Sequence, residues 1–143
     1  MATIQRSVLV EYSDEQMFDL INDIEAYPKF MQGCKEAKVI SRKDGEVVGE
    51  LCLSGSGITL RVTTRNQLQR PDKIIMQLVE GDFSKFNAHW EFLPLNEAAC
   101  KVTLNMEFKL TSKILNLAAG NMLTSSANAL VDSLVKRAKE VYG

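Results

Sequence analysis

The sequence predicts an α+β fold in which a curved antiparallel sheet wraps around a long C-terminal helix. Most of the chain alternates apolar and polar residues, which is typical of strands in a sheet with one dry and one wet face. Residues 112–142 instead repeat apolar positions every three or four residues, as an amphipathic helix does. A dry sheet face must be covered, and this helix is the element long enough to cover it.

The N-terminal part combines one strand with two short helices. Residues 3–11 alternate as a strand with its apolar side chains on one face. Ser13-Asp14-Glu15-Gln16 has the capping-box pattern and predicts a helix start. The helix that follows would bury Met17, Phe18, Ile21 and Ile24. Pro28 then begins a further helical turn, where its missing N–H is tolerated.

Six further strands are predicted between residues 35 and 110. Residues 35–42 and 46–54 form a hairpin through a Lys-Asp-Gly turn, and the Ser- and Gly-rich residues 54–57 reverse the chain again. In the strand over 58–68, alternation directs Thr63 outward. A turn at Arg70-Pro71-Asp72 leads into three more strands, over residues 73–80, 86–93 and 100–110. The predicted order is therefore β-α-α-β-β-β-β-β-β-α.

The long helix carries an apolar stripe suited to the dry face of the sheet. The stripe comprises Leu115, Ala118, Met122, Leu123, Ala127, Leu130, Val131, Leu134, Ala138 and Val141. Gly120 interrupts the helix at a cost of roughly 1 kcal/mol relative to alanine. Close packing, a bend and a hinge are all consistent with a glycine at this position.

Composition limits the classes of function. The 143 residues predict one domain over 1–143, and 45% hydrophobic with 24% charged residues is ordinary for a globular protein. A net charge of -1 predicts no DNA binding and no strong attraction to an acidic membrane, although a local basic patch is compatible with it. Three widely spaced cysteines without a C-x-x-C pair favour neither disulfides nor zinc. With no signal-peptide or membrane-spanning pattern, we expect a cytoplasmic protein.

Motifs for catalysis are absent from the sequence. Strand alternation places the single histidine, His89, on the polar face beside Asn87 and Glu91, which favours a solvated residue. The nucleotide-binding, metalloprotease and hydrolase motifs do not occur. The sequence therefore predicts a binding protein without metal or cofactor.

Between the sheet and the long helix, the sequence predicts an apolar cavity that could hold a hydrophobic small molecule. Aromatic, aliphatic and methionine residues would line it: Tyr27, Phe30, Leu60, Val62, Met76, Leu78, Trp90, Met106, Phe108, Met122, Leu123 and Leu130. Methionines adapt to ligands of varied shape, but the same residues would also make an ordinary core.

Three polar residues, Arg6, Asn66 and Glu80, fall in phase with apolar neighbours. Inside a cavity they would orient the polar head of a ligand, because buried polar groups need partners. The simpler interpretation, which we favour for each, places them near strand ends in contact with water. A basic cluster could likewise touch phosphate, but the interspersed acidic residues favour a solvated face: Lys29, Lys35, Lys38, Arg42 and Lys43.

Several motifs resemble a known family. Tyr27-Pro28-Lys29-Phe30-Met31 with Cys34 resembles the Y-P-x-F-(x)3-C signature of the coenzyme-Q-binding branch of the START/polyketide-cyclase superfamily. Residues 63–68, 78–83, 90–95 and 137–142 are similar in order and spacing to the family of ribosome-association toxins called RatA. The resemblance covers essentially the whole chain.

The resemblance implies a helix-grip fold and two functions. The first is a non-catalytic protein that holds a ubiquinone-like isoprenoid lipid in the cavity and supports respiration. The alternative is a toxin that binds the large ribosomal subunit and blocks its association with the small one, which inhibits translation. A cyclase-type enzyme, as found elsewhere in the superfamily, would need an acid or base in the cavity, and Glu80 is the candidate.

Overall fold

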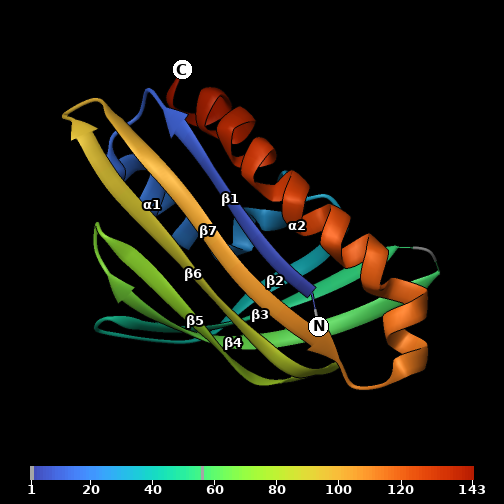
Figure 1. The fold of residues 1–143 in the computed structure, drawn as a ribbon. Coiled ribbons are helices and arrows are strands. Elements are labelled where there is room, and N and C mark those ends of the chain that lie inside the picture. Colours follow the sequence, from blue (N-terminus) through green and yellow to red (C-terminus); the bar gives the residue numbers. More distant parts are fainter. Residues whose placement is uncertain (1, 56) are drawn as a thin grey trace.

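The computed structural model describes residues 2–55 and 57–143, which form a seven-stranded antiparallel sheet and a long helix packed against it (Figure 1). The elements follow in the order β1 (Ala2–Val10), α1 (Asp14–Asn22), the 3-10 helix η1 (Ile24–Lys29), β2 (Cys34–Lys43), β3 (Glu46–Gly55), β4 (Ile58–Gln69), β5 (Lys73–Gly81), β6 (Phe83–Asn96), β7 (Ala99–Leu110) and α2 (Lys113–Tyr142). The predicted α+β fold and the predicted order of elements are confirmed. Ser56, in the predicted 54–57 reversal, lies outside the described residues.

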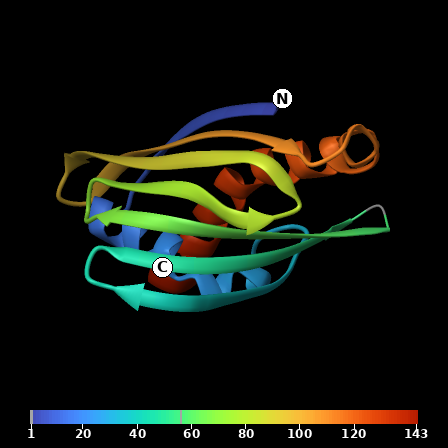
Figure 2. The same cartoon turned by 90° about the horizontal axis from the view of Figure 1, so that it is seen from below.

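The strands lie in the order β1-β7-β6-β5-β4-β3-β2, and every neighbouring pair is antiparallel. From β2 to β7 each strand pairs with the next along the chain, whereas β1 pairs with the last strand. The two short helices carry the chain from the β1 edge to the β2 edge. Seen from below, the sheet curls, and the helices lie on its concave side (Figure 2).

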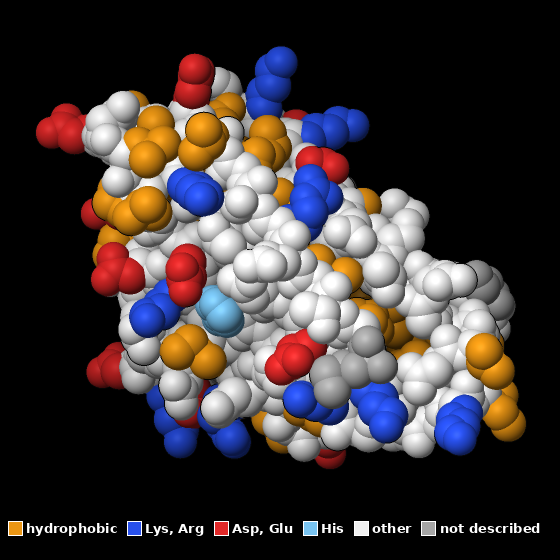
Figure 3. Space-filling model, in the orientation of Figure 1, with side chains coloured by type: hydrophobic (Ala, Val, Ile, Leu, Met, Phe, Trp, Pro, Cys, Tyr) orange, Lys and Arg blue, Asp and Glu red, His pale blue; other side chains and the backbone are white. Residues whose placement is uncertain are grey.

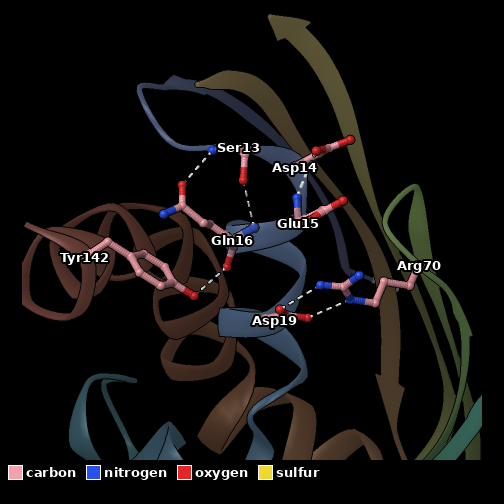
Figure 4. Close-up of polar contacts among 7 residues, drawn as sticks. All are labelled: Ser13, Asp14, Glu15, Gln16, Asp19, Arg70 and Tyr142. Atoms are coloured by element: carbon pink, nitrogen blue, oxygen red, sulfur yellow. Dashed lines mark hydrogen bonds and ion pairs between the residues drawn. The ribbon is translucent and has the colours of Figure 1, made fainter. Parts of the chain in front are cut away.

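Helix α1 begins where the capping box predicts (Figure 4). The Ser13 hydroxyl accepts a hydrogen bond from the Gln16 amide at 3.1 Å, and the Gln16 side chain accepts one from the Ser13 amide at 2.9 Å. The hydroxyl of Tyr142 donates to the Gln16 carbonyl at 2.8 Å, which joins the end of α2 to the start of α1. Arg70 reaches the same helix through two 2.9 Å hydrogen bonds to Asp19.

The core fills the concave side in two adjoining clusters. One lies beneath α1 and the C-terminal half of α2 around Trp90, which is 1% exposed. The other lies beneath the N-terminal half of α2 around Phe108 and Leu123. Burial of these apolar surfaces is the main favourable contribution to folding, and it fixes α2 across the sheet.

The apolar stripe of α2 differs from the prediction at both ends. Ala118 and Val141 are exposed, whereas Ala119 is fully buried. Ala119 lies four residues before Leu123 and so shares its face, while Val141 lies in the helix's last turn. A Cβ added at Gly120 would have no atom within 4 Å, so the close-packing interpretation of this glycine is wrong.

Candidate ligand cavity

An apolar cavity of about 60 Å³ lies between the sheet and α2. Side chains from η1, from the five strands β3 to β7 and from α2 all contribute to its wall. The described lining residues are Tyr27, Met31, Leu51, Leu53, Val62, Met76, Phe83, Phe86, Trp90, Met106, Phe108, Leu123, Ser126, Ala127 and Leu130. Pockets that enclose a drug-sized ligand usually measure about 300–1,000 Å³, so this cavity is smaller than such a pocket.

The structure brings eight of the twelve predicted lining residues to the cavity: Tyr27, Val62, Met76, Trp90, Met106, Phe108, Leu123 and Leu130. Whether they bind a ligand stays a prediction. The other four lie outside its lining. Phe30 packs against Tyr27 with ring centres 5.2 Å apart, Leu60 is buried elsewhere in the second core cluster, and Met122 contacts Gly55. Leu78 is half-buried just before an irregularity in β5.

Seven lining residues are absent from the predicted list of lining residues: Met31, Leu51, Leu53, Phe83, Phe86, Ser126 and Ala127. Strand β3 is apolar on both faces near its end, where Leu51, Cys52 and Leu53 follow one another, so alternation does not reveal which side faces inward. Phe83 lies before the start of the strand predicted over residues 86–93. In the structure β6 begins at Phe83, with a register shift between Phe83 and Lys85 that keeps Phe83 buried.

Two glycines lie where other segments approach the helix that closes the cavity. A Cβ at Gly55 would lie 2.7 Å from Met122 Cγ, and a Cβ at Gly33 would lie 3.2 Å from both Ser126 Oγ and the Ser54 carbonyl oxygen. Gly33 has a φ of +82°, a left-handed backbone that favours glycine. The Gly33 carbonyl accepts a 2.7 Å hydrogen bond from the Ser54 amide, which ties the loop after η1 to β3.

Asn66 is buried, so the solvated interpretation of this residue is wrong. It lines a small hollow of about 20 Å³ together with Thr64, and this hollow shares Tyr27, Leu51 and Met76 with the main cavity. The Asn66 side-chain oxygen accepts a 2.8 Å hydrogen bond from the Thr64 hydroxyl. The interior therefore has an apolar chamber with a polar end beside it.

Arg6 does not line the cavity, although it lies in phase with the inward residues of β1. Its guanidinium donates to the Asn128 carbonyl at 2.6 Å and to the Asp132 carboxylate at 3.0 Å. Arg6 is half-buried at the edge of the sheet, where it connects β1 to α2.

Glu80 is exposed on the outside of the sheet. The pairing of β4 with β5 shifts between Thr63 and Thr64, so β5 contains one extra residue before Glu80. This irregularity removes Glu80 from the inward phase, and the carboxyl group considered for acid–base chemistry does not face the cavity. Thr63, predicted to point outward, is paired with Glu50 and Glu80, yet it is buried and donates a 3.3 Å hydrogen bond to Glu50.

The titratable groups at the cavity wall favour their neutral forms. Burial raises the pKa of the Tyr27 phenol, which donates a 2.6 Å hydrogen bond to the Ile21 carbonyl. Burial, with the neighbouring Cys52 as a smaller cause, raises the pKa of the nearby Cys34 thiol to about 11. Neither group is poised as a base or a nucleophile near neutral pH.

The remaining polar candidates lie on the outside. His89 is partly exposed near Asn105 and Glu91, as predicted for a solvated strand residue. The basic cluster, Lys29, Lys35, Lys38, Arg42 and Lys43, is exposed. Within residues 2–55 and 57–143, no group of three or more His, Cys, Asp or Glu side chains could hold a metal ion. Nor is any helix there long and apolar enough to cross a membrane.

A curved antiparallel sheet that encloses an apolar cavity against a long C-terminal helix defines a helix-grip protein of the START type. Residues 10–135 match the family "Polyketide cyclase / dehydrase and lipid transport". The chain belongs to this family and, within it, to the group that includes the RatA proteins.

Relatives with assigned names cover the whole chain. This chain is 41% identical over 143 residues to the ribosome association toxin RatA of Vibrio cholerae, and the alignment covers 100% of this chain and 99% of that one. Identity to RatA of Escherichia coli K12 is 39% over 142 residues, with 99% and 90% covered. The coenzyme Q-binding protein COQ10 homolog B of Xenopus laevis is 23% identical over 141 residues, 96% of this chain and 58% of that protein.

Solved structures share the fold. A protein from Thermus thermophilus superposes with a TM-score of 0.86 at 17% identity, covering 99% of this chain and 100% of that one. An aromatase/cyclase from Streptomyces sp. R1128 superposes with a TM-score of 0.82 at 16% identity, covering 99% and 96%. At such identities the likeness concerns the fold alone.

Proposed function

We propose that this protein acts on ribosomes in the cytoplasm, binding the large subunit and blocking its association with the small one. The observation that supports this most directly is the similarity to RatA proteins along the whole chain, at 41% identity. The family itself, the fold and the cavity do not distinguish a toxin from a lipid carrier, so the full-length likeness decides the order of the two proposals.

Contact with ribosomal RNA requires accessible positive charge. The edge strand β2 offers it, because Lys35, Arg42 and Lys43 are exposed along it. These side chains lie outside the core, so they can be exchanged without disturbing the cavity. They are the first residues that we would test as phosphate contacts.

The experiment is overproduction of the full chain followed by sedimentation of ribosomes in a sucrose gradient. We expect fewer assembled ribosomes, more free subunits, and the protein in the large-subunit fractions. A triple variant, Lys35→Gln, Arg42→Gln and Lys43→Gln, should weaken this effect, whereas Lys136→Gln with Lys139→Gln at the far end of α2 should not. An unchanged gradient with the wild-type chain would overturn the proposal.

The second proposal is that the protein holds a hydrophobic ligand of the isoprenoid quinone class and thereby supports respiration without catalysing a reaction. The apolar cavity and the adjoining Thr64 and Asn66 support it, because a quinone combines an apolar tail with a polar head. The similarity to a coenzyme Q-binding protein adds support for the ligand class. The cavity of about 60 Å³ would have to widen to admit such a tail.

Organic extraction of the chain purified from its native host, followed by mass spectrometry, tests this second proposal. We expect a lipid in stoichiometric amount, and addition of a short-chain ubiquinone to the emptied protein should restore binding. Asn66→Leu should weaken quinone binding more than it weakens binding of a simple alkane. Failure of both extraction and re-binding would exclude the ligand while leaving the ribosome proposal intact.

We propose no enzymatic reaction. The Glu80 carboxylate lies outside the sheet, and the Tyr27 and Cys34 groups beside the cavity hold their protons. The cavity therefore offers no described group suited to acid–base or nucleophilic work at neutral pH. Incubation with candidate polyketide substrates should leave them unchanged, and turnover of any of them would contradict this.

A further inference from the structure

The first turns of α2 expose two large aliphatic side chains. Ile114 is 78% exposed and Leu117 is 86% exposed, the highest values among the large hydrophobic residues described. They lie three residues apart and so share one face of the helix. Leu115 and Ala119 pack on the second core cluster instead, so Ile114 and Leu117 lie on a face that the protein's own core leaves uncovered.

Positive charge gathers at the same end of the sheet. Lys85 and Lys109 are paired directly across β6 and β7, and Lys113 begins α2 four residues later. Lys85 lies 3.7 Å from Glu107, whereas Lys109 and Lys113 have no ion-pair partner within 4 Å among the described residues. Figure 3 shows basic side chains along the lower edge and hydrophobic ones at the lower right, over the start of α2.

The contact between Gly55 of β3 and Met122 of α2 lies at this same end of the molecule. The end of β3 lies beside the N-terminal half of α2 (Figure 1), and Gly55 contacts Met122 there. A surface that touched this end would therefore touch the half of α2 that carries Met122 and the cavity residue Leu123.

We propose that Ile114 and Leu117, flanked by Lys85, Lys109 and Lys113, dock this protein on an anionic lipid bilayer. The two aliphatic side chains would reach the boundary of the acyl chains while the ammonium groups contact lipid phosphates. Protruding aliphatic groups have no π-face on which bases could stack, so the patch suits a lipid surface better than RNA. The inference does not depend on ribosome binding.

The expected attachment is weak and reversible. Each lysine near an anionic surface strengthens binding by about fivefold, and Glu107 offsets part of the charge of Lys85. Loss of two partly inserted aliphatic side chains should weaken binding by about tenfold or more. The patch alone therefore predicts attachment that salt reverses, because screening weakens attraction between exposed charges.

Flotation of the full chain with lipid vesicles tests the proposal. We expect the protein to float with vesicles containing phosphatidylglycerol and to stay behind with pure phosphatidylcholine. Ile114→Ser with Leu117→Ser should lose about tenfold in binding. Lys109→Gln with Lys113→Gln should lose about 25-fold, which is fivefold for each lysine. The matched controls, Leu93→Ser with Leu95→Ser and Lys136→Gln with Lys139→Gln, change exposed residues elsewhere and should bind as the wild type does.

Circular dichroism and thermal unfolding establish that each variant is folded before its binding is compared. The proposal is overturned if the wild type does not float, or if the patch and control variants lose binding equally. If Ile114→Ser with Leu117→Ser abolishes sedimentation with ribosomes while vesicle binding is unchanged, the proposal is overturned as well, because the patch then serves ribosome binding.

Discussion

Met122 of α2 covers Gly55 at the end of β3 so closely that a Cβ on this glycine would lie 2.7 Å from Met122 Cγ. Substitution Gly55→Ala should therefore push α2 away from the hairpin and lower the free energy of unfolding by about 1–3 kcal/mol. Hydrogen exchange should quicken in the N-terminal half of α2 and stay unchanged in α1. Equal exchange in both proteins would mean that Met122 moves aside without loosening the helix.

Gly120 should behave in the opposite way, because it has open space around its Cα and lies in the interior of α2. Gly120→Ala should raise the free energy of unfolding by about 0.5–1 kcal/mol, since alanine loses less conformational freedom on folding. The matched substitution Gly45→Ala should destabilise, because Gly45 has a φ of +73°. Urea unfolding of the three proteins measures both effects, and a Gly120→Ala protein less stable than the wild type would indicate that the glycine has a role in bending.

Two buried cysteines should make the free energy of unfolding depend on pH in the alkaline range. Burial raises the pKa of Cys34 and of Cys100 from 9.0 to about 11, with Cys52 and Asp14 as the respective smaller causes. Between these pH values the folded chain keeps protons that the unfolded chain has released, so stability should fall as pH rises from 9 to 11. Urea unfolding across this range should show a shallower fall for Cys34→Ser with Cys100→Ser.

Thiol labelling offers a check on the same two residues. Cys52 is half-buried on β3, whereas Cys34 and Cys100 are buried. At neutral pH a thiol reagent should label Cys52 first and the other two only as the chain unfolds. Labelling of Cys100 as fast as Cys52 in the folded protein would contradict the packing of β7 against α1.

The course of the chain could be predicted because apolar periodicity and turn residues are local signals. The capping box at Ser13 and the alternation from Cys100 to Leu110 both correspond to the observed elements. Which side chains face the cavity was harder to predict. Asn66 and Glu80 look alike in the sequence, since each follows an apolar run in phase, yet one is buried and the other exposed.

The difference arises from one register shift between β4 and β5. A bulge inserts a residue into one strand and reverses the side on which later residues lie, so strict alternation along β5 assigns Glu80 to the wrong face. Helical stripes carry a related uncertainty, because neighbouring positions such as Ala118 and Ala119 differ by one step around the helix. A shift of one residue in a strand or one position in a helix changes which side chains line the cavity, but it does not change the fold.

Arg6 and Arg70 each contact an aspartate at about 3 Å but should contribute differently to stability. Arg6 is the more buried and also donates to the Asn128 carbonyl, so Arg6→Met should cost about 1–3 kcal/mol and loosen β1 from α2. Arg70 pairs with Asp19 at the surface, where water and salt screen the charges, so Arg70→Met should leave the free energy of unfolding nearly unchanged. If urea unfolding shows the same loss of stability in Arg6→Met and Arg70→Met, the contact of Arg6 with α2 does not contribute to the free energy of unfolding.

A larger side chain at Ala127 separates the two proposed functions. Ala127 lines the cavity of about 60 Å³, so leucine there would occupy the space that a ligand needs. Ala127→Leu should abolish recovery of bound lipid and lower the free energy of unfolding by at most about 3 kcal/mol through overpacking.

The effect of Ala127→Leu on ribosome sedimentation should be small, because the cavity does not reach the surface of β2. Ser125→Leu, an exposed change on the same helix, is the matched control and should retain the lipid. Loss of both activities in Ala127→Leu, with the fold intact, would mean that ribosome binding requires the filled cavity.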